Sequence, residues 1–263
     1  MKPDGVDFWD HRHSQLPVLV AVGCDGVGVP FNRWMYRVRA HVFQRAVAPL
    51  LAGMPAPRVL DVGSGFGFYV DRWLELGVAD VTASDAAPTA ISKLRARHRQ
   101  VPVLELDITS FEIEAGGPYD VVSAFDVLFH LCDDASYARA AHNLSALLRP
   151  GGLLVFSENF HRHGRRVVSK VQVDRNESEV IELMRAAGLE PLVRRPMFWL
   201  MNEPQNAPGT TLDTWWRWLR SMLRARPGLG HVIGPVLYLP ELALVLRRPP
   251  PGPSTNLMVC RKL

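Results

Sequence analysis

The feature that most constrains the fold is a regular alternation of strand-like and helix-like segments in the middle of the chain. Segments with helical spacing or helix-start signals follow several of the short apolar runs. Strands that alternate with helices across short loops form a parallel sheet that is covered on both faces. The sequence therefore predicts an α/β, doubly wound domain, with its first strands at 58–62, 81–84, 101–106, 119–125 and 153–157.

Two regions depart from this alternation. The first is residues 1–56, before the first strand. The second is a Trp-rich segment at about 202–253, which separates two further predicted strands at 189–194 and 257–261. We predict an N-terminal helical lid over 1–56 and a Rossmann-like domain over 57–263, with a helical cap inserted between its last two strands.

A glycine-rich loop, Asp61-Val62-Gly63-Ser64-Gly65-Phe66-Gly67, follows the first predicted strand. Glycines let the backbone approach a ligand closely, and the helix N-terminus behind the loop favours negative groups. Dinucleotide-binding proteins use a GxGxxG spacing, in which the third glycine allows close packing of helix and strand. Phe68 occupies that third position here, so the pattern is GxGxG. By itself the loop is a weak signal.

Carboxylates follow the strands at the edge where a doubly wound sheet binds its ligand. A pyrophosphate would be repelled by that much negative charge. S-adenosylmethionine carries no phosphate and offers an ammonium, a sulfonium, a ribose diol and an adenine amino group, all of which suit carboxylates. The sequence therefore favours this cofactor. The four residues are Asp61, Asp85, Asp107 and Asp126.

In combination, these motifs resemble the class I S-adenosylmethionine-dependent methyltransferases, of the small-molecule type, over residues 57–158. The resemblance implies a seven-stranded sheet whose last strand is antiparallel. It also implies that the chain is a methyltransferase. The likeness rests on the residues 59–67, Asp85, Asp107-Ile108, Tyr119-Asp120-Val121-Val122 and Leu147-Leu148-Arg149-Pro150-Gly151-Gly152.

The resemblance also implies where the cofactor binds. It places the methionine moiety at the glycine loop and its amino group at the backbone near the end of the fourth strand. It places the ribose on the second-strand acid and the adenine at the third. A short N-terminal motif, Trp9-Asp10-His11-Arg12, resembles a lid whose arginine contacts the cofactor carboxylate, with an ordinary surface arginine as the open alternative. The predicted cofactor-binding residues are Arg12, Asp61, Gly63, Ser64, Gly65, Asp85, Ala86, Asp107, Ile108 and Phe125.

His130 is the candidate catalytic residue. It follows the fourth predicted strand, and the resemblance places that position near the transferred methyl group. Histidine titrates near neutral pH and can remove a proton from an acceptor as it attacks. A histidine in the pocket wall is the competing interpretation. His161 and His163 lie in a basic loop after the fifth strand, which we predict to be solvated.

The acceptor is predicted to be a small, partly hydrophobic molecule with an O, N or C nucleophile. Enzymes that methylate base amino groups typically carry an Asn/Asp-Pro-Pro-aromatic motif after the fourth strand. Phe125-Asp126-Val127-Leu128 stands there instead, so no nucleic-acid partner is expected. The Trp-rich insertion suits a cap on the sheet or on a second subunit, with a lipid-like substrate as an alternative. A homodimer through the cap is one such arrangement.

The cysteines and the hydropathy pattern indicate the compartment. Cys24, Cys132 and Cys260 lie far apart and form no CxxC pair, so we expect neither a metal site nor a disulfide framework. A reducing, cytoplasmic environment is predicted. The longest apolar stretch, 232–246, is shorter than the roughly 20 residues that span a bilayer. No transmembrane segment is therefore predicted.

Three other functions stay open from the sequence. A lyase or cyclase can use S-adenosylmethionine on the same fold. A nicotinamide-dependent oxidoreductase is disfavoured by Phe68 and by the excess of carboxylates at the strand ends. A non-catalytic binding or membrane-associated protein would use the Trp-rich insertion. The sequence does not identify the methyl acceptor.

Overall fold

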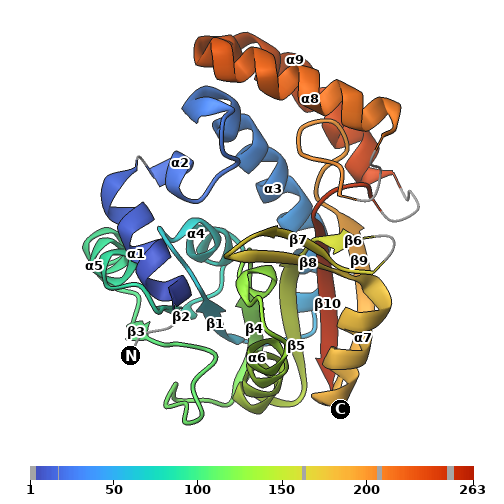
Figure 1. The fold of residues 1–263 in the computed structure, drawn as a ribbon. Coiled ribbons are helices and arrows are strands. Elements are labelled where there is room, and N and C mark those ends of the chain that lie inside the picture. Colours follow the sequence, from blue (N-terminus) through green and yellow to red (C-terminus); the bar gives the residue numbers. More distant parts are fainter. Residues whose placement is uncertain (1–3, 17, 162–163, 206–208, 248–251) are drawn as a thin grey trace.

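A seven-stranded sheet forms the centre of the computed structural model (Figure 1). The strand order is β3-β2-β1-β4-β5-β10-β9, and β10 runs antiparallel to both of its neighbours. The predicted sheet with an antiparallel last strand is therefore confirmed. The structure describes residues 4–16, 18–161, 164–205, 209–247 and 252–263. The strands are β1 Arg58–Val62, β2 Asp80–Asp85, β3 Val103–Glu105, β4 Tyr119–Ala124, β5 Leu148–Glu158, β9 Leu189–Pro196 and β10 Asn256–Lys262.

Helices cover both faces of the sheet because successive strand residues point to opposite sides. Val121 belongs to one apolar core and its neighbour Val122 to the other. Two helices on the second face begin at side-chain caps: Asp133 accepts from Ser136 N at 2.8 Å, and Asn176 accepts from Glu179 N at 2.8 Å. The covering helices are α4 Phe68–Glu75, α5 Pro88–Arg97, α6 Asp134–Leu147 and α7 Glu177–Ala186.

Three helices precede the sheet: α1 Asp4–Gln15, α2 Val18–Ala21 and α3 Gly28–Leu51. The first of them lies against α5, as a lid would. The Asp10 carboxylate accepts a hydrogen bond from Thr89 N at 2.7 Å, and Lys93 Nζ donates to the His13 carbonyl at 2.7 Å. These two bonds hold α1 at the edge of the sheet where the glycine loop lies.

The insertion between β9 and β10 is helical, as predicted. It contains α8 Thr211–Ala225, η2 Pro227–Leu229 and α9 Gly230–Leu246, while residues 206–208 and 248–251 lie outside the described part. The buried Glu241 carboxylate accepts from Trp199 N at 2.6 Å and from Leu200 N at 2.7 Å. Because those residues follow β9, this carboxylate fastens α9 to the end of the sheet.

The apolar helix of the insertion corrects one expectation. Pro227–Leu246 forms a 20-residue helical segment that is long and apolar enough, by length and composition, to cross a membrane, and only 22% of an 18-residue stretch of it is buried inside the protein. The expectation that no stretch reaches this length is therefore wrong. The prolines do not end the helix, and η2 extends it at its start.

A second, small sheet was missed from the sequence. Its strands are β6 Phe160–His161, β7 Arg166–Ser169 and β8 Gln172–Asn176, in the order β6-β8-β7. His161, expected in a solvated loop, is half-buried in β6, and His163 lies outside the described residues. The strands are short and rich in charge, so no apolar alternation marked them.

Candidate cofactor and acceptor site

The glycine loop has a backbone that only glycine adopts easily. Gly63, Gly65 and Gly67 have φ angles of 68°, 55° and 81°. A Cβ atom added to Gly63 would lie 2.4 Å from Val127 Cγ2. Ser64 N donates to the Ser84 carbonyl at 2.8 Å, which fixes the loop against β2. The loop is thus held in its turn by the end of β2, and Val127 after β4 leaves no room for a side chain at Gly63.

Asp85 joins this loop to the next helix. Its Oδ2 accepts from Gly65 N at 2.8 Å, and its Oδ1 accepts from Ala87 N at 2.9 Å. Burial raises the pKa of Asp85, and the backbone donors oppose that rise. Each carboxylate oxygen has a second lone pair, so Asp85 can also accept from a ligand hydroxyl. Ala86, the half-buried residue between Asp85 and Ala87, lies at the same corner.

Asp61 lies beneath the loop and is only 1% exposed. Its Oδ1 accepts from Ser123 Oγ at 2.5 Å, and its carbonyl accepts from Ser64 Oγ at 2.9 Å. Burial raises the pKa of Asp61 to about 6, against the effect of its hydroxyl partners. Its side chain therefore ties β1 to β4 under the loop.

The residues after β3 form a turn that α6 supports. Asp107 Oδ1 accepts from Thr109 N at 2.9 Å and from Thr109 Oγ1 at 2.7 Å. Asn143 of α6 donates to the Ile108 carbonyl at 2.8 Å, and Ile108 is 5% exposed. This turn stands beside β2 at the same edge as the glycine loop.

The end of β4 carries an ion pair that sequence reasoning missed. Arg39 of α3 donates to Asp126 Oδ2 at 2.7 Å and to Tyr69 Oη at 3.2 Å. Ser157 Oγ donates to the other Asp126 oxygen at 2.8 Å. The preceding Phe125 stacks on Tyr69 with ring centroids 3.7 Å apart, so its ring packs into the core. The sequence grouped Asp126 with the carboxylates that could attract a cationic cofactor, but Arg39 already neutralises it.

His130 lies in a short 3-10 turn, η1 Leu128–His130, and its Nδ1 is 2.6 Å from the Val171 carbonyl of the β7–β8 hairpin. A carbonyl only accepts, so Nδ1 carries the hydrogen and Nε2 keeps its lone pair in the neutral ring. Burial lowers the pKa of His130, which favours this neutral form. The missed hairpin therefore fixes the tautomer that a general base requires.

Helix α1 contacts both halves of the site. The His13 ring meets Phe66 of the glycine loop edge-on at 4.8 Å, and Trp9 meets His130 edge-on at 4.6 Å. Burial lowers the pKa of His13 to about 4, so this ring is neutral. Arg12 Nε donates to the Ala21 carbonyl at 2.7 Å. The predicted contact of Arg12 with the cofactor carboxylate stays a prediction.

Glu158 ends β5 in a buried polar network that the sequence did not indicate. Tyr137 Oη donates to Glu158 Oε2 at 2.9 Å, and Asn159 N donates to Oε1 at 2.9 Å. The fully buried Arg175 guanidinium stacks over Tyr137 at 4.3 Å. Burial raises the pKa of Glu158 to about 8, so the folded protein holds a proton that the unfolded chain releases near pH 4.5.

This proton predicts how stability depends on pH. The contribution of Glu158 to the free energy of unfolding is complete below pH 4.5 and is lost as pH rises to about 8. Between these pH values the carboxyl ionises only in the unfolded state, and this ionisation stabilises the unfolded state. We expect Glu158→Gln to raise the free energy of unfolding at pH 8 by at least about 1 kcal/mol and to leave it nearly unchanged at pH 5. Urea unfolding at both pH values measures this. A variant that is destabilised equally at both would contradict it.

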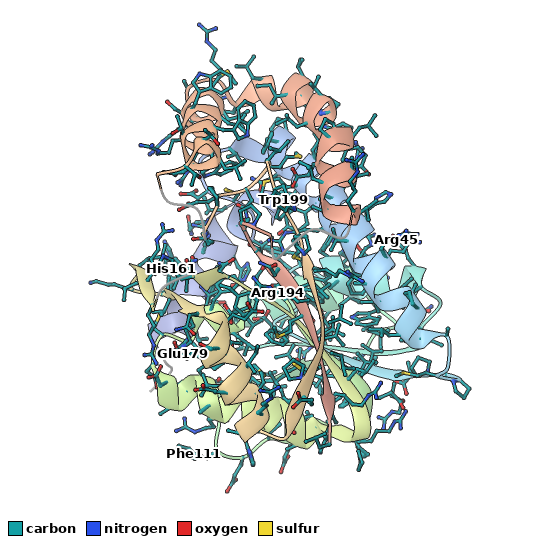
Figure 2. The ribbon with its side chains drawn as sticks, turned by 90° about the vertical axis from the view of Figure 1, so that its right-hand side faces the viewer. Arg45, Phe111, His161, Glu179, Arg194 and Trp199 are labelled. Atoms are coloured by element: carbon teal, nitrogen blue, oxygen red, sulfur yellow. The ribbon has the colours of Figure 1, made fainter. Side chains whose placement is uncertain are left out.

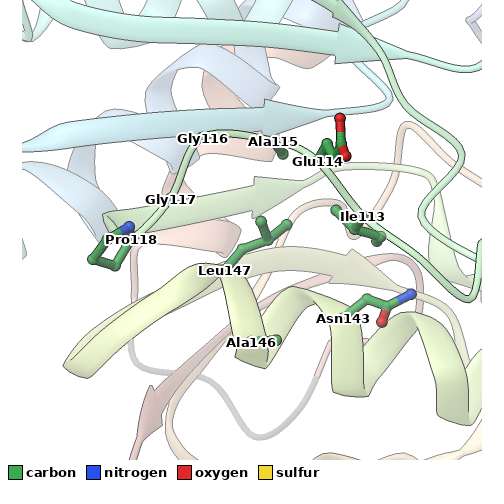
Figure 3. A pocket seen from close by; sticks show the side chains of 9 residues that line it. All are labelled: Ile113, Glu114, Ala115, Gly116, Gly117, Pro118, Asn143, Ala146 and Leu147. Atoms are coloured by element: carbon green, nitrogen blue, oxygen red, sulfur yellow. The ribbon is translucent and has the colours of Figure 1, made fainter.

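A surface hollow lies away from the glycine loop and His130. It has a volume of about 590 Å³ and lies between the segment before β4 and helix α6 (Figure 3). The hollow borders the start of β4, whereas His130 and Asp126 follow the end of that strand, so it is separate from the candidate site although Asn143 contacts both. It is lined by Ile113, Glu114, Ala115, Gly116, Gly117, Pro118, Asn143, Ala146 and Leu147.

Sequence comparisons agree with this geometry. A family model described as a methyltransferase domain matches residues 59–152. A ubiquinone biosynthesis O-methyltransferase from Ruegeria pomeroyi is 34% identical over 158 residues, which cover 52% of this chain and 62% of that protein. The chain thus spans less than two thirds of the length of this curated relative.

Solved structures share the fold over the full chain. Magnesium protoporphyrin IX methyltransferase from Synechocystis, solved with bound S-adenosylmethionine, has a TM-score of 0.57 at 13% identity and covers 100% of this chain and 99% of that one. The N-methyltransferase NodS from Bradyrhizobium japonicum, solved with S-adenosylhomocysteine, has a TM-score of 0.55 at 15% identity and covers 99% of each chain. Because both identities are low, the likeness to these structures establishes the shared fold alone.

Proposed function

We propose that this chain is an S-adenosylmethionine-dependent methyltransferase that methylates a hydroxyl group of a small, partly apolar molecule. The methyltransferase-domain match over residues 59–152 and the shared fold support this proposal. The names of the curated relatives, which are O-methyltransferases, support an oxygen nucleophile. Neither a nucleic-acid partner nor a metal enters the proposal. Cytoplasmic localisation stays a prediction.

The observation that carries the proposal is the position of helix α1. One face of this helix touches the glycine loop through His13 and touches the candidate base through Trp9. A cofactor at the loop and an acceptor at His130 would therefore meet under one lid. Holding two reactants in line supplies much of the acceleration of a bimolecular displacement.

The residues present fit the cofactor. Three glycines bring the loop backbone close to a ligand, and Asp85 keeps lone pairs for the ribose hydroxyls beside the loop. Asp107 and Ile108 are proposed to border the adenine, and the backbone of Phe125 to accept from the methionine ammonium. When bound, S-adenosylmethionine supplies an electrophilic methyl group on a sulfonium.

His130 is proposed to take the proton of the acceptor hydroxyl. The neutral ring presents Nε2 as the acceptor atom because Nδ1 is bonded to Val171. As the hydroxyl oxygen bonded to the methyl carbon, the bond from that carbon to sulfur would break and leave S-adenosylhomocysteine, and the hydroxyl proton would pass to Nε2. An imidazolium then forms, and the bond from Nδ1–H to the Val171 carbonyl stabilises it.

Calorimetry and product analysis test the function. We expect S-adenosylmethionine and S-adenosylhomocysteine to bind with micromolar affinity, and NADH not to bind. Incubation with methyl-labelled S-adenosylmethionine and a metabolite extract should give S-adenosylhomocysteine and a labelled methyl ether. Folded protein that binds neither sulfur compound contradicts the proposal. Cofactor consumption without S-adenosylhomocysteine would indicate lyase or cyclase chemistry instead.

Asp85→Ala gives a quantitative check on the cofactor site. We expect it to weaken S-adenosylhomocysteine binding by about 1–3 kcal/mol, because charge-assisted bonds to the ribose are lost. Asp80→Ala, at the exposed start of the same strand, is the matched control and should leave affinity unchanged. Calorimetry measures both. Equal affinities for the two variants would show that Asp85 does not contact the cofactor.

A further inference from the structure

The outer face of α9 is an apolar stripe with no partner among the described residues. It consists of Val232, Val236, Leu239, Ala243 and Leu246, which recur at helical spacing. Four of these side chains are strongly exposed: Val232 is 63% exposed, Val236 66%, Leu239 70% and Leu246 41%. A contiguous exposed apolar face of this kind marks an interaction surface.

The stripe points away from the protein because the opposite face of α9 is packed on α3. Gly234 meets Trp34, where an added Cβ would lie 2.2 Å from Trp34 Cδ1, and the Tyr238 hydroxyl lies 3.0 Å from His41 Nδ1. Glu241 on the same inner face holds the backbone after β9. In Figures 1 and 2, α8 and α9 form one end of the molecule, and Phe111 lies at the other.

The charged side chains near the stripe are mainly arginines. Exposed Arg226 precedes the helix and exposed Arg247 follows it. Arg37 of α3 stands beside the α3–α9 seam, since its guanidinium stacks 4.1 Å from the centre of the Trp34 ring. Within α3, α8 and α9, all of which the structure describes, the carboxylates are Glu241, which is fully buried, and Asp213 in the first turn of α8, which pairs with Arg217 at 3.5 Å.

We propose that this stripe docks on the surface of an anionic lipid bilayer, with α9 lying in the plane of the interface. The exposed apolar residues would enter the acyl boundary, and the arginines that flank α9 would meet anionic headgroups. The inner face of α9 packs on α3, so the basic residues flank this helix instead of forming a face of it. A second copy of this chain fits less well because two facing stripes would bring the arginines of one copy close to those of the other, and like charges repel. A membrane span fits less well because it would detach Glu241 and Tyr238 from their partners. The proposal is independent of the proposed methyl transfer.

Co-sedimentation of the full chain with vesicles tests the proposal. We expect binding to phosphatidylcholine vesicles that contain phosphatidylglycerol, and much weaker binding to phosphatidylcholine alone or at high salt. The double substitution Val236→Glu/Leu239→Glu should lower partitioning at least about tenfold, because two apolar side chains no longer enter the bilayer. Phe111→Glu, at the opposite end of the molecule, is the matched control and should bind as the wild type does.

A second variant distinguishes the contribution of the arginines to vesicle binding from that of the apolar side chains. Arg226→Gln/Arg247→Gln should weaken binding to the anionic vesicles several-fold and leave the weak binding to neutral vesicles unchanged. Three outcomes would overturn the proposal: no binding of wild type to anionic vesicles, a dimer in solution that Val236→Glu/Leu239→Glu dissociates, or membrane association that resists alkaline carbonate. Circular dichroism of each variant verifies that it is folded.

Discussion

Replacing His130 by glutamine is expected to lower kcat by about 10²–10⁴-fold, the usual contribution of a general base. Glutamine can still donate to the Val171 carbonyl, so the turn after β4 keeps its anchor while the basic nitrogen is lost. Steady-state kinetics with the labelled cofactor measure the change once an acceptor is identified. The affinity for S-adenosylhomocysteine should stay within about twofold of wild type, because the variant removes no proposed cofactor contact.

The pH profile gives this prediction a second readout. Burial is the main cause that lowers the pKa of His130, with Arg12 in the same direction and Asp126 and the Val171 bond opposing. The neutral base therefore persists to a pH below its ordinary value of 6.5. We expect the acid limb of kcat/KM to lie below pH 6.5 in the wild type and to vanish in His130→Gln.

The exposed His142 on α6 supplies the control. His142→Gln should leave both kcat and the pH profile unchanged. If His130→Gln loses cofactor affinity and turnover together, His130 is a binding residue. If it loses neither, the ring is a structural part of the pocket wall and the acceptor needs no base from this position.

The central sheet was predictable because its signals are local. Each of the first strands is a short apolar run, and the loops that follow contain glycine or aspartate, so the place of Gly63 and Asp85 at the sheet edge was predictable from spacing, while their cofactor roles came with the family resemblance. The hydrogen bond from Gly65 of the loop to Asp85 joins residues only 20 positions apart, at the ends of two adjacent strands. Strand order and the antiparallel last strand came with the family resemblance, since period-2 patterns do not specify which strands pair.

The remaining parts depend on contacts between distant segments. Arg39 meets Asp126 across 87 residues, and His130 meets Val171 across 41, and no local pattern records either pairing. The β7–β8 hairpin carries charged and exposed side chains, so its strands lack apolar alternation. Helix α9 continues through two prolines because η2 and the packing on α3 support it, which sequence propensity alone did not anticipate.

Breaking the ion pair between Arg39 and Asp126 is expected to have the largest effect on the free energy of unfolding. The two side chains are 11% and 24% exposed, and Asp126 adopts a left-handed φ of 56° at the turn that leads to His130. Arg39→Met would leave this carboxylate without its cation in a largely dry site. We expect the free energy of unfolding to fall by about 3 kcal/mol, near the lower bound for breaking a buried pair. Urea denaturation at pH 7 measures it.

The double variant Arg39→Met/Asp126→Asn distinguishes a buried charge from lost packing. Removing both charges leaves no uncompensated ion, so most of the lost stability should return, since replacing a whole buried pair is often close to neutral. The asparagine still accepts from Ser157 and tolerates the left-handed turn. A loss below about 1 kcal/mol in Arg39→Met would instead indicate a solvated surface pair. A double variant no more stable than the single one would show that Arg39 contributes through its stacking on Tyr36 and Phe198.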